Sequence, residues 1–538
     1  MTRYAPLCAL GSVHEAFAQT AARCPDRPML NVQPGTAEIY GIAAGEITYA
    51  QAAAEVDLLA AGFADAGYGA GMRVALLLEN RPRYFLIWLA LNRLGVSVVP
   101  INPDLRAAEL EYLIGHAEPA LIIALPARAE GLRAASATAG IDAPVIAPGD
   151  APPAPRAGAA IAGPETGQAG EAALLYTSGT TGQPKGCVLS NTYFLYAGDW
   201  YAELGGIGTL EDGARMITPL PIFHMNAMAC SFMAMLAVGG CLTALDRFHP
   251  STWWADVRGA RATCLHYLGV MPSMLMGADE TPADRDHSVR FGFGAGVDPK
   301  LQAAFEARFG FPLVEAWAMT ETGSGAAISA HSEDRLVGAA CFGRATAEVE
   351  TRLVDEDGRD ADQGELLVRR AGPDPRFGFF TRYFKNPEAT DEAWAGGWFH
   401  TGDIVRRDAA GNLFFIDRKK NVIRRSGENI AAVEVESVLM RHPAIHAAGV
   451  APVPDAIRGD EVFACLVADP TLDPQALADW ALTQMAYYKV PGYVALVEAL
   501  PLTATQKIQR AALKDQAAAL LAAGQATDLR ARKRRQVA

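Results

Sequence analysis

Strand patterns and helical patterns alternate along the first part of the sequence, and this alternation limits the chain to few architectures. Between Ile47 and Leu125, short apolar runs typical of buried strands flank a longer run, Arg83–Leu94, whose apolar spacing predicts a helix. The runs that predict strands are Val74–Leu78, Val96–Ile101 and Leu121–Leu125. A second alternating region extends from Met216 to Gly325. Because alternating strands and helices wind into mostly parallel sheets, the sequence predicts an α/β fold of wound subdomains.

The other segments carry different patterns. Short strand signals with Gly and Asp-Gly turns predict a β-rich subdomain from Gly338 to Phe415. A small α+β unit is expected after Arg418, extending to about Leu521. The stretch from Ala147 to Gly170 is rich in Ala, Pro and Gly, which predicts a surface connector.

The composition excludes several classes of protein. The 538 residues are 50% hydrophobic and 20% charged, as expected for a globular protein with a large core and not for a disordered or disulfide-rich chain. The formal net charge of −13 argues against a dedicated nucleic-acid binder, because such proteins neutralise phosphates with clustered Lys and Arg. The one basic run, Arg530–Arg535, is expected to be a solvated, frayed tail rather than a binding arm.

Two further features favour a cytoplasmic location without an integral membrane segment. The eight Cys residues are scattered without zinc spacing, which is typical of free thiols in a reducing compartment. Met216–Leu245 carries no charged residue, but Pro, His, Asn and Gly interrupt it. We therefore expect a buried helix there, followed by a buried strand, Cys241–Leu245.

The most specific segment is the loop Tyr176–Gly186, which reads Tyr-Thr-Ser-Gly-Thr-Thr-Gly-Gln-Pro-Lys-Gly and follows the short apolar strand Ala172–Leu175. Its glycines, hydroxyl groups and lysine make a flexible cradle of donors suited to polyphosphate, although it does not match a Walker A loop. The candidate phosphate-binding residues of this loop are Thr177, Ser178, Gly179, Thr180, Thr181, Gly182 and Lys185. This run resembles the phosphate-binding signature of the AMP-forming adenylating superfamily, which contains acyl-CoA synthetases, amino-acid adenylation domains and firefly-type luciferases.

Four more segments resemble motifs of that superfamily, in the same order, so that the resemblance extends from about Thr48 to Arg510. The segment Ala316–Gly323 implies that Trp317 stacks on adenine, that Thr320 contacts phosphate and that Glu321 helps to hold Mg²⁺. The segments around residues 397–403, 417–430 and 500–510 imply five further roles. Asp403 would bind the ribose hydroxyls, Arg418 would lie near ribose and phosphate, Lys420 would be the hinge, Gly427 would lie beside the CoA tunnel and Lys507 would be the catalytic lysine.

The resemblance also implies the architecture and the reaction. It implies an N-terminal adenylate-forming domain, residues 1–419, and a mobile C-terminal lid domain, residues 420–538. The implied activity is that of an acyl-CoA synthetase, which uses ATP, Mg²⁺ and CoA to form an acyl-AMP with release of pyrophosphate and then an acyl-CoA, with fatty acid metabolism as its general setting. The expected partners are a carboxylic acid, ATP and CoA, with a homodimer as a further hypothesis. The alternatives are an adenylating enzyme that uses a carrier-protein thiol or activates an amino acid, a luciferase-like oxygenase and a non-catalytic homologue.

The resemblance places an acyl pocket on several segments, most like those of the crotonobetaine/carnitine-CoA ligase-like branch. His224 matches the position that gates this pocket and counts among the catalytic candidates. Gly294 and Ala295 are expected to contact the nucleotide as well. The pocket residues that we predict are Trp200, His224, Asn226, Met228, Gly269, Met271, Gly294 and Gly296. No acidic residue stands out in these segments that could pair with a trimethylammonium group. We therefore expect the substrate to be an uncharged short- to medium-chain or ring-bearing acid.

Overall fold

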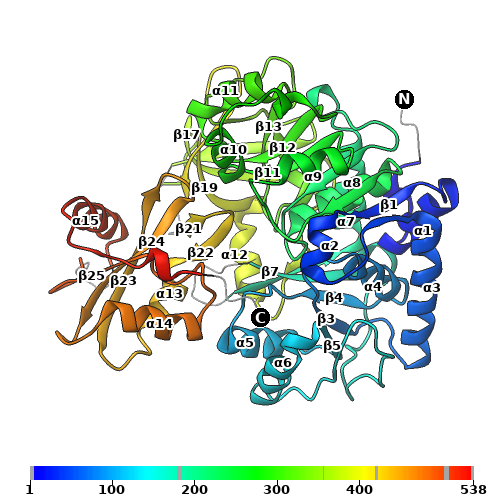
Figure 1. Cartoon of the computed structure of the whole chain (residues 1–538), viewed down its shortest axis with the longest axis horizontal. Coiled ribbons are helices and arrows are strands. Elements are labelled where there is room, and N and C mark those ends of the chain that lie inside the picture. Colours follow the sequence, from blue (N-terminus) through cyan, green and yellow to red (C-terminus); the bar gives the residue numbers. More distant parts are fainter. Residues whose placement is uncertain (1–4, 178–183, 356, 419–421, 502–507, 535–538) are drawn as a thin grey trace.

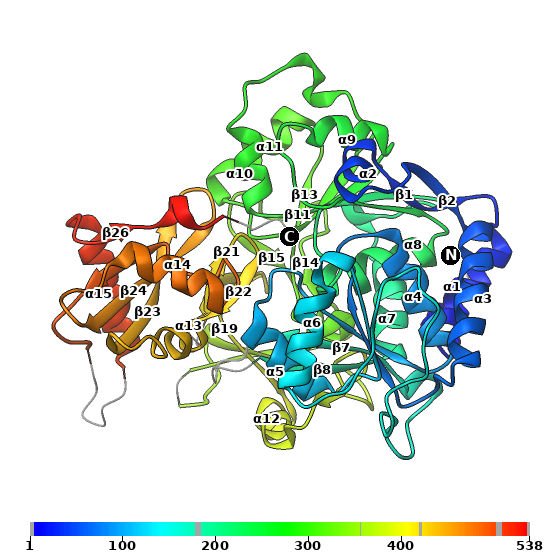
Figure 2. The ribbon, with the colours of Figure 1, turned by 60° about the horizontal axis from the view of Figure 1, so that its bottom comes forward.

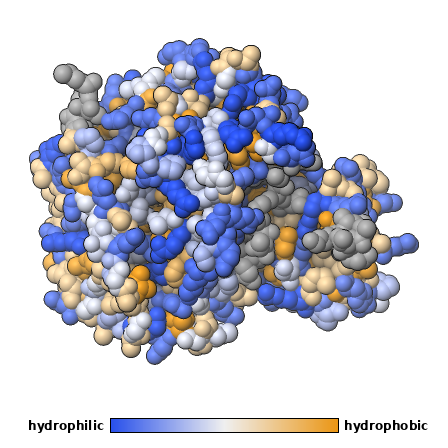
Figure 3. All heavy atoms as spheres, turned by 180° about the vertical axis from the view of Figure 1, so that it is seen from behind, coloured by the Kyte–Doolittle hydropathy of each residue, from blue (hydrophilic) through white to orange (hydrophobic). Residues whose placement is uncertain are grey.

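A computed structural model describes residues 5–177, 184–355, 357–418, 422–501 and 508–534. Figure 1 shows a large N-terminal part, coloured blue to yellow, and a smaller C-terminal part, coloured orange to red, on one side of it. Both parts mix helices with sheets, which confirms the predicted α/β class with a small α+β unit at the end. On the face drawn in Figure 3, hydrophilic residues predominate and apolar residues are scattered.

A seven-stranded sheet forms one half of the large part. Its strands, in spatial order, are β18 (Arg382–Tyr383), β8 (Lys185–Ser190), β7 (Glu171–Thr177), β4 (Ser97–Pro100), β3 (Arg73–Leu77), β5 (Leu121–Ala124) and β6 (Val145–Ile146). The strands from β7 to β6 are parallel, and β8 and β18 extend the sheet in antiparallel fashion. The predicted strands at Val74, Val96 and Leu121 are therefore confirmed, with ends that differ by one residue or so.

An eight-stranded sheet forms the other half. Its strands, in spatial order, are β14 (Ile328–Ser329), β13 (Leu313–Trp317), β12 (Phe291–Ala295), β11 (Cys264–Leu268), β9 (Arg215–Thr218), β10 (Cys241–Ala244), β1 (Pro28–Val32) and β2 (Gly45–Thr48). The strands from β13 to β1 are parallel, with antiparallel strands at the two edges. This is the second wound region that the sequence predicts.

The two sheets and their helices form alternating layers. One core cluster joins the facing sides of both sheets to the helices between them: α1 (Val13–Arg23), α3 (Tyr49–Asp65), α4 (Pro82–Arg93), α7 (Asn191–Ala202) and α8 (Phe232–Ala237). Helices α5 (Ala107–Ala117) and α6 (Pro126–Thr138) cover the outer side of the seven-stranded sheet. Helices α9 (Trp253–Gly259), α10 (Val270–Met276) and α11 (Pro299–Phe309) cover the outer side of the eight-stranded sheet. Because α4 lies between two sheets, it is buried on every side from Tyr84 to Asn92 and not only on the apolar face that its sequence indicates.

The segment Met216–Leu245 folds as predicted. Strand β9 is followed by a π-helical turn, Asn226–Ser231, which continues into α8, and strand β10 comes next. Nearly the whole segment from Ala227 to Leu242 is buried in the core. Within the described ranges, no helix is long and apolar enough to cross a membrane.

The β-rich region is a five-stranded antiparallel sheet, in the order β15 (Cys341–Gly343), β20 (Leu413–Arg418), β19 (Phe399–Arg407), β17 (Gln363–Arg370) and β16 (Val349–Val354). Two short helices, α2 (Pro34–Tyr40) and α12 (Pro387–Ala393), complete the large part, and α12 packs against β18 and β19. The stretch from Ala147 to Gly170 contains only a single short helical turn near its end, so the predicted connector is confirmed.

The C-terminal part is built on a separate sheet of β22 (Glu428–Ala431), β21 (Val422–Arg425), β24 (Gly459–Ala468), β25 (Tyr493–Leu496) and β26 (Thr527–Asp528), with β23 (Ile445–Asp455) paired to β24. Its helices are α13 (Ala432–Leu439), α14 (Pro474–Gln484) and α15 (Arg510–Ala522), and Figure 2 shows them around this sheet. It has its own core clusters, apart from those of the large part. The predicted domain boundary at 419 and 420 lies outside the described residues, so its position stays a prediction.

The expectation of a frayed basic tail is wrong for residues 530–534. Arg530 bonds to Asp528, and Arg532 bonds to Asp479. The side chain of Lys533 is fully buried and bonds to Glu461. The tail is docked because acidic side chains of its own domain neutralise it, and a pattern of consecutive cations alone does not reveal such partners.

Candidate functional site

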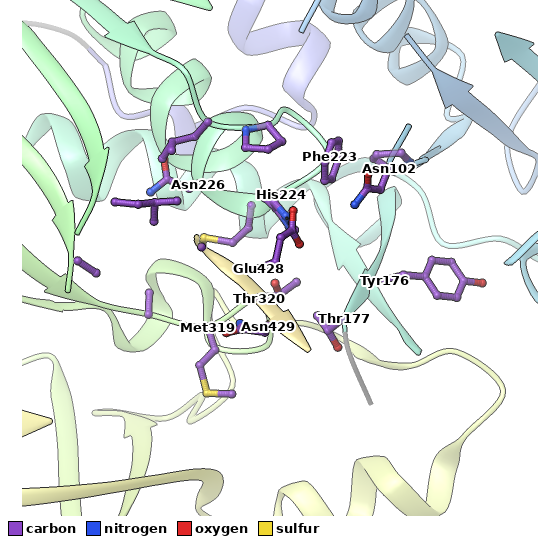
Figure 4. A pocket seen from close by; sticks show the side chains of 18 of the residues that line it. Asn102, Tyr176, Thr177, Phe223, His224, Asn226, Met319, Thr320, Glu428 and Asn429 are labelled. Carbon is purple, nitrogen blue, oxygen red and sulfur yellow. Dashed lines mark ion pairs between the residues drawn. The ribbon is translucent and has the colours of Figure 1, made fainter. Parts of the chain in front are cut away.

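A cavity of about 350 Å³ opens where the two wound sheets meet the C-terminal part. Parallel strands end at it: Thr177 ends β7, Leu268 ends β11, Ala295 ends β12 and Trp317 ends β13. Sites in open α/β sheets are expected at the carboxyl ends of strands. Of the predicted site residues, the cavity brings together Thr177, Trp200, His224, Asn226, Gly294, Ala295, Trp317, Thr320, Glu321 and Gly427, and Figure 4 shows several of them around it.

The carboxylate of Glu321 is held in place at one wall of the cavity. Its Oε1 accepts hydrogen bonds from Tyr383 Oη at 2.9 Å and from Thr177 Oγ1 at 3.4 Å. The adjacent backbone oxygen of Thr320 accepts a hydrogen bond from Tyr193 Oη at 2.9 Å. This wall therefore presents fixed oxygen atoms beside Thr177, where the predicted phosphate loop begins.

These residues fit a hard cation that is held mainly by a bound polyphosphate. Within the described ranges, no three His, Cys, Asp or Glu side chains form a metal cluster. Mg²⁺ commonly binds through one or two carboxylates together with substrate phosphates and water, so a single oriented carboxylate such as Glu321 matches its chemistry.

Trp317 and Asp403 are directly joined. The indole Nε1 of Trp317 donates a hydrogen bond of 2.8 Å to Oδ2 of Asp403. Asp403 is only 1% exposed. Asp403 lies on β19, opposite the backbone of Arg418 on β20. Asp403 is not part of the cavity lining, whereas Trp317 is. The aromatic residue thus fixes the orientation of the carboxylate that the resemblance assigns to ribose.

Some predicted residues lie elsewhere. Met228 and Met271 are buried in core clusters and do not line the cavity, because both side chains fill space between helices and a sheet. Lys185 lies over the ring of Tyr383, with Nζ 4.7 Å from its centre, rather than in the cavity lining. Ser178, Gly179, Thr180, Thr181, Gly182, Lys420 and Lys507 lie outside the described residues, as does the side chain of Arg418.

Glycine is required at position 294 for a reason other than contact with a ligand. The resemblance implies that Gly294 lines the acyl pocket and contacts the nucleotide. A Cβ at this position would lie 2.2 Å from the backbone oxygen of Tyr267 on the neighbouring strand β11. Close approach of the two strands therefore requires glycine here, whatever the substrate.

A second cavity of about 220 Å³ adjoins the first. The two cavities share Leu268, Ala295, Arg424 and Gly427 in their linings. Gly269 and Gly296, which we predicted for the acyl pocket, line this second cavity and not the first. Its lining carries two cations, Arg424 and Arg458, and two acids, Asp298 and Asp455.

The C-terminal part contributes its β21–β22 hairpin to the first cavity. Glu428, on this hairpin, approaches His224 of the large part, with Oε2 and Nε2 3.6 Å apart. The hairpin turns at Ser426 and Gly427, which both have a positive φ. The sequence marks residues 417–430 as a motif, but it does not indicate that Glu428 meets His224.

Polar contacts far apart in sequence join the two parts beside the cavity. Lys489 Nζ lies 2.5 Å from carboxylate oxygens of both Glu109 and Glu434, and all three side chains are almost fully buried. Tyr488 Oη accepts a hydrogen bond of 3.0 Å from Asn102. Burial opposes the charge on Lys489, but the two carboxylates outweigh burial and raise its pKa above the ordinary value. Sequence reasoning missed this group because no local pattern links residues 380 positions apart.

Comparison with known proteins identifies the class to which this fold and site belong. The pattern of the AMP-binding enzyme family matches residues 17–374, and that of the AMP-binding enzyme C-terminal domain matches residues 434–507. The chain therefore belongs to the AMP-binding enzyme family.

Individual relatives make the class narrower. A sulfoacetate–CoA ligase of Cupriavidus necator is 31% identical over 521 residues, which cover 93% of this chain and 97% of that protein. A crotonobetaine/carnitine–CoA ligase of Citrobacter koseri is 29% identical over 490 residues, covering 87% and 93%. An o-succinylbenzoate CoA synthetase of Bacillus subtilis has the same fold, with a TM-score of 0.79 at 24% identity over 93% of this chain and 98% of that one.

The predicted class and activity are thereby confirmed. The protein is an ATP-dependent acyl-CoA ligase of the adenylate-forming type, and an acceptor other than CoA is not favoured. Its large N-terminal and small C-terminal domains match the fold of such enzymes.

Proposed function

We propose that the first cavity holds the carboxylic acid and the ATP together, and that its residues divide the chemistry as the sequence motifs imply. The observation that carries this proposal is that Thr177, Trp317, Thr320 and Glu321 line one cavity although they come from different strands and loops. In the first step, a carboxylate oxygen of the acid attacks the α-phosphorus of ATP, and pyrophosphate leaves. Acyl-AMP forms, and no covalent bond to the protein is needed.

The nucleotide is proposed to lie between Trp317 and the phosphate loop. Asp403, oriented by the indole of Trp317, accepts hydrogen bonds from the ribose hydroxyls. The phosphates are neutralised or oriented by the loop from Thr177 to Lys185 and by Thr320. Glu321 would hold Mg²⁺, which would supply positive charge to the phosphate oxygen atoms.

The second step is proposed to use the second cavity as the entrance for CoA. The CoA thiol attacks the carbonyl carbon of acyl-AMP, the bond to AMP breaks and the thiol proton is lost. Gly427 lies where the two cavities meet, and Arg424 and Arg458 can attract the phosphates of CoA. Because the β21–β22 hairpin already lines the first cavity, the described arrangement suits this second step better than the first.

For the acid itself we propose an uncharged short- to medium-chain or ring-bearing compound. Trp200 and Phe293 meet edge to face in the cavity wall, with ring centres 6.1 Å apart, and offer an apolar surface. The named relatives act on charged acids, sulfoacetate and crotonobetaine or carnitine, so this preference would distinguish the present chain from them. We further propose a cytoplasmic location, which suits eight free thiols, and the homodimer stays a prediction that gel filtration would test.

The division of roles is tested with Lys507→Ala. Its charge is proposed to stabilise the negative charge that builds up as the carboxylate attacks ATP. We expect the variant to form acyl-AMP about a hundredfold more slowly or worse, while thioester formation from supplied acyl-AMP and CoA stays close to wild type. Equal loss of both half-reactions would refute the role assigned to Lys507.

A further inference from the structure

A chain of hydrogen bonds lies behind the wall of the first cavity, and no step of the reaction uses it. His266, on β11, is fully buried. Its Nε2 lies 3.0 Å from Tyr201 Oη, and its Nδ1 lies 2.9 Å from Ser231 Oγ and 2.7 Å from Asn226 Oδ1. Asn226 is the member of this chain that reaches the cavity lining.

The π-helical turn explains why these groups meet. In a π-helix, residue i bonds to residue i+5, so Asn226 and Ser231, at the two ends of the turn, lie one above the other. The hydroxyl of Ser231 donates to the backbone oxygen of Asn226 at 3.2 Å. An ordinary α-helical turn would place these two side chains on different faces. The unusual turn therefore has a definite result, which is a fixed orientation for the side chain of Asn226.

The proton positions follow from the same contacts. Because Ser231 already donates to a backbone oxygen, its oxygen is left to accept from His266 Nδ1. The Nδ1 proton is then shared with Asn226 Oδ1, and Nε2 accepts from the hydroxyl of Tyr201. Burial lowers the pKa of His266 to about 3, in agreement with a neutral ring. With Oδ1 occupied by His266, the amide nitrogen of Asn226 is turned away from the histidine.

That amide nitrogen is a donor in need of an acceptor. No hydrogen bond to it is found in the part of the chain that the structure describes, yet it is not sealed from solvent. Trp200, Phe293 and Cys230, which line the same cavity, carry no strong acceptor. The carboxylates of Glu321 and Glu428, in the same lining, contact Tyr383, Thr177 and His224 instead of this amide. A half-buried donor that loses water when the acid binds costs free energy unless the acid supplies an acceptor.

We propose that Asn226 is a specificity-determining residue, whose amide donates a hydrogen bond to a keto or ether oxygen carried by the acyl group. The inference rests on the proposed function of this cavity as the acyl site and deepens it. The cations of the cavity lining, Arg424 and Lys489, both belong to the C-terminal part. Tyr201, His266, Ser231 and Asn226 are all neutral, so we expect the acyl group beside them to be uncharged apart from the reacting carboxylate. A second carboxylate or a sulfonate would require a cation to offset its loss of water.

The experiment uses matched pairs of acids, in which an unsubstituted short- to medium-chain or aryl acid is compared with the same acid carrying one keto or ether oxygen at successive positions. Pyrophosphate release with ATP, Mg²⁺ and CoA gives kcat/KM for each acid. We expect the wild-type enzyme to prefer the oxygenated member at one position by about tenfold or more.

Two variants separate recognition from structural support. Asn226→Leu removes the donor at similar volume. Asn226→Asp keeps an oxygen that can accept from His266 but replaces the NH₂ group with an acceptor that repels the substrate oxygen. We expect the ratio of kcat/KM between the two acids to fall about tenfold in the first variant and at least as far in the second. The ratio is independent of any general loss of folding, because both acids are measured on the same enzyme.

The outcomes distinguish this inference from the function on which it rests. An unchanged ratio in both variants, or a wild-type enzyme that prefers unsubstituted acids or a sulfonate, would overturn the role of Asn226 and leave the ligase activity intact. Release of pyrophosphate with none of the acids would overturn the proposed acyl site as well.

Discussion

At the scale of single residues, the proposed acyl side of the cavity depends on His266, a histidine that does not line it. His266 is neutral because it is fully buried and its two ring nitrogens are already used by Tyr201 and by Asn226 with Ser231. Such a group ties the stability of the protein to pH, since it must stay uncharged for the fold to persist.

The sign of this effect can be worked out. The folded pKa of His266 is lowered to about 3, whereas an unfolded histidine titrates near its ordinary value of about 6.5. Between these values only the unfolded chain binds the proton, so this contribution is complete above about pH 6.5 and is lost as the pH falls toward 3. We expect the free energy of unfolding to fall by at most about 1.4 kcal/mol per pH unit through this group.

The measurement is urea unfolding of the wild type and of His266→Gln at several pH values from about 7 to about 4. The variant should show the shallower decline with pH, whatever its stability at neutral pH. Parallel declines in the two proteins would show that His266 already carries its charge in the folded state.

At the scale of elements, the β21–β22 hairpin lines both cavities, and we propose that it connects the two half-reactions. Gly427 has φ +91°, and a Cβ there would lie 2.2 Å from Cδ1 of Leu268, a residue that lines both cavities. The backbone conformation of this position favours glycine, and a side chain added there would have to displace the end of Leu268. Any side chain added here enters the passage between the cavities.

We expect Gly427→Leu to slow thioester formation from supplied acyl-AMP and CoA by at least about tenfold, while acyl-AMP formation changes little. Both half-reactions are followed separately, by thioester formation and by pyrophosphate release. Gly411→Leu is the matched control, because Gly411 has φ +85° but lies in a surface turn with no close neighbour. The tunnel assignment fails if the two variants behave alike.

Sequence patterns predict regular strands and helices well, and they predict the turns that join them poorly. The strands at Val74 and Leu121 and the helix at Arg83 appear as expected, because an apolar run with the right spacing is a local signal. The π-helical turn at Asn226 has no such signal, since its shape follows from packing against β11 and its histidine. For the same reason Met228 and Met271, both apolar and in the right segments, turn out to fill cores rather than the cavity.

At the scale of the whole molecule, a buried ion group joins the two domains in the described arrangement. Lys489 of the C-terminal domain bonds to Glu109 of the large domain and to Glu434 of its own. Of the two ion pairs that Lys489 forms, rotation of the C-terminal domain would break the one with Glu109 and keep the one with Glu434. Such a group favours the docked arrangement without locking it, as the proposed alternation of the C-terminal domain between two steps would require.

Glu109→Gln should weaken this docking while preserving the helix, because Gln can also complete the capping box in which Glu109 bonds to the backbone of Arg106. We expect thioester formation from supplied acyl-AMP to slow by about tenfold, with acyl-AMP formation unaffected or faster. Glu111→Gln, on the same helix, is the control. Slower acyl-AMP formation with normal thioester formation would mean that the contact serves the first step instead.

The central claim is that this enzyme makes an acyl-CoA in two steps from an uncharged carboxylic acid, ATP and CoA. The most direct test is pyrophosphate release with ATP and Mg²⁺ across a panel of acids, with and without CoA. The account predicts continuous turnover only when CoA is present, and only with one chemical group of uncharged acids. Turnover with amino acids in the absence of CoA would contradict it, and so would a lack of turnover with every acid of the panel.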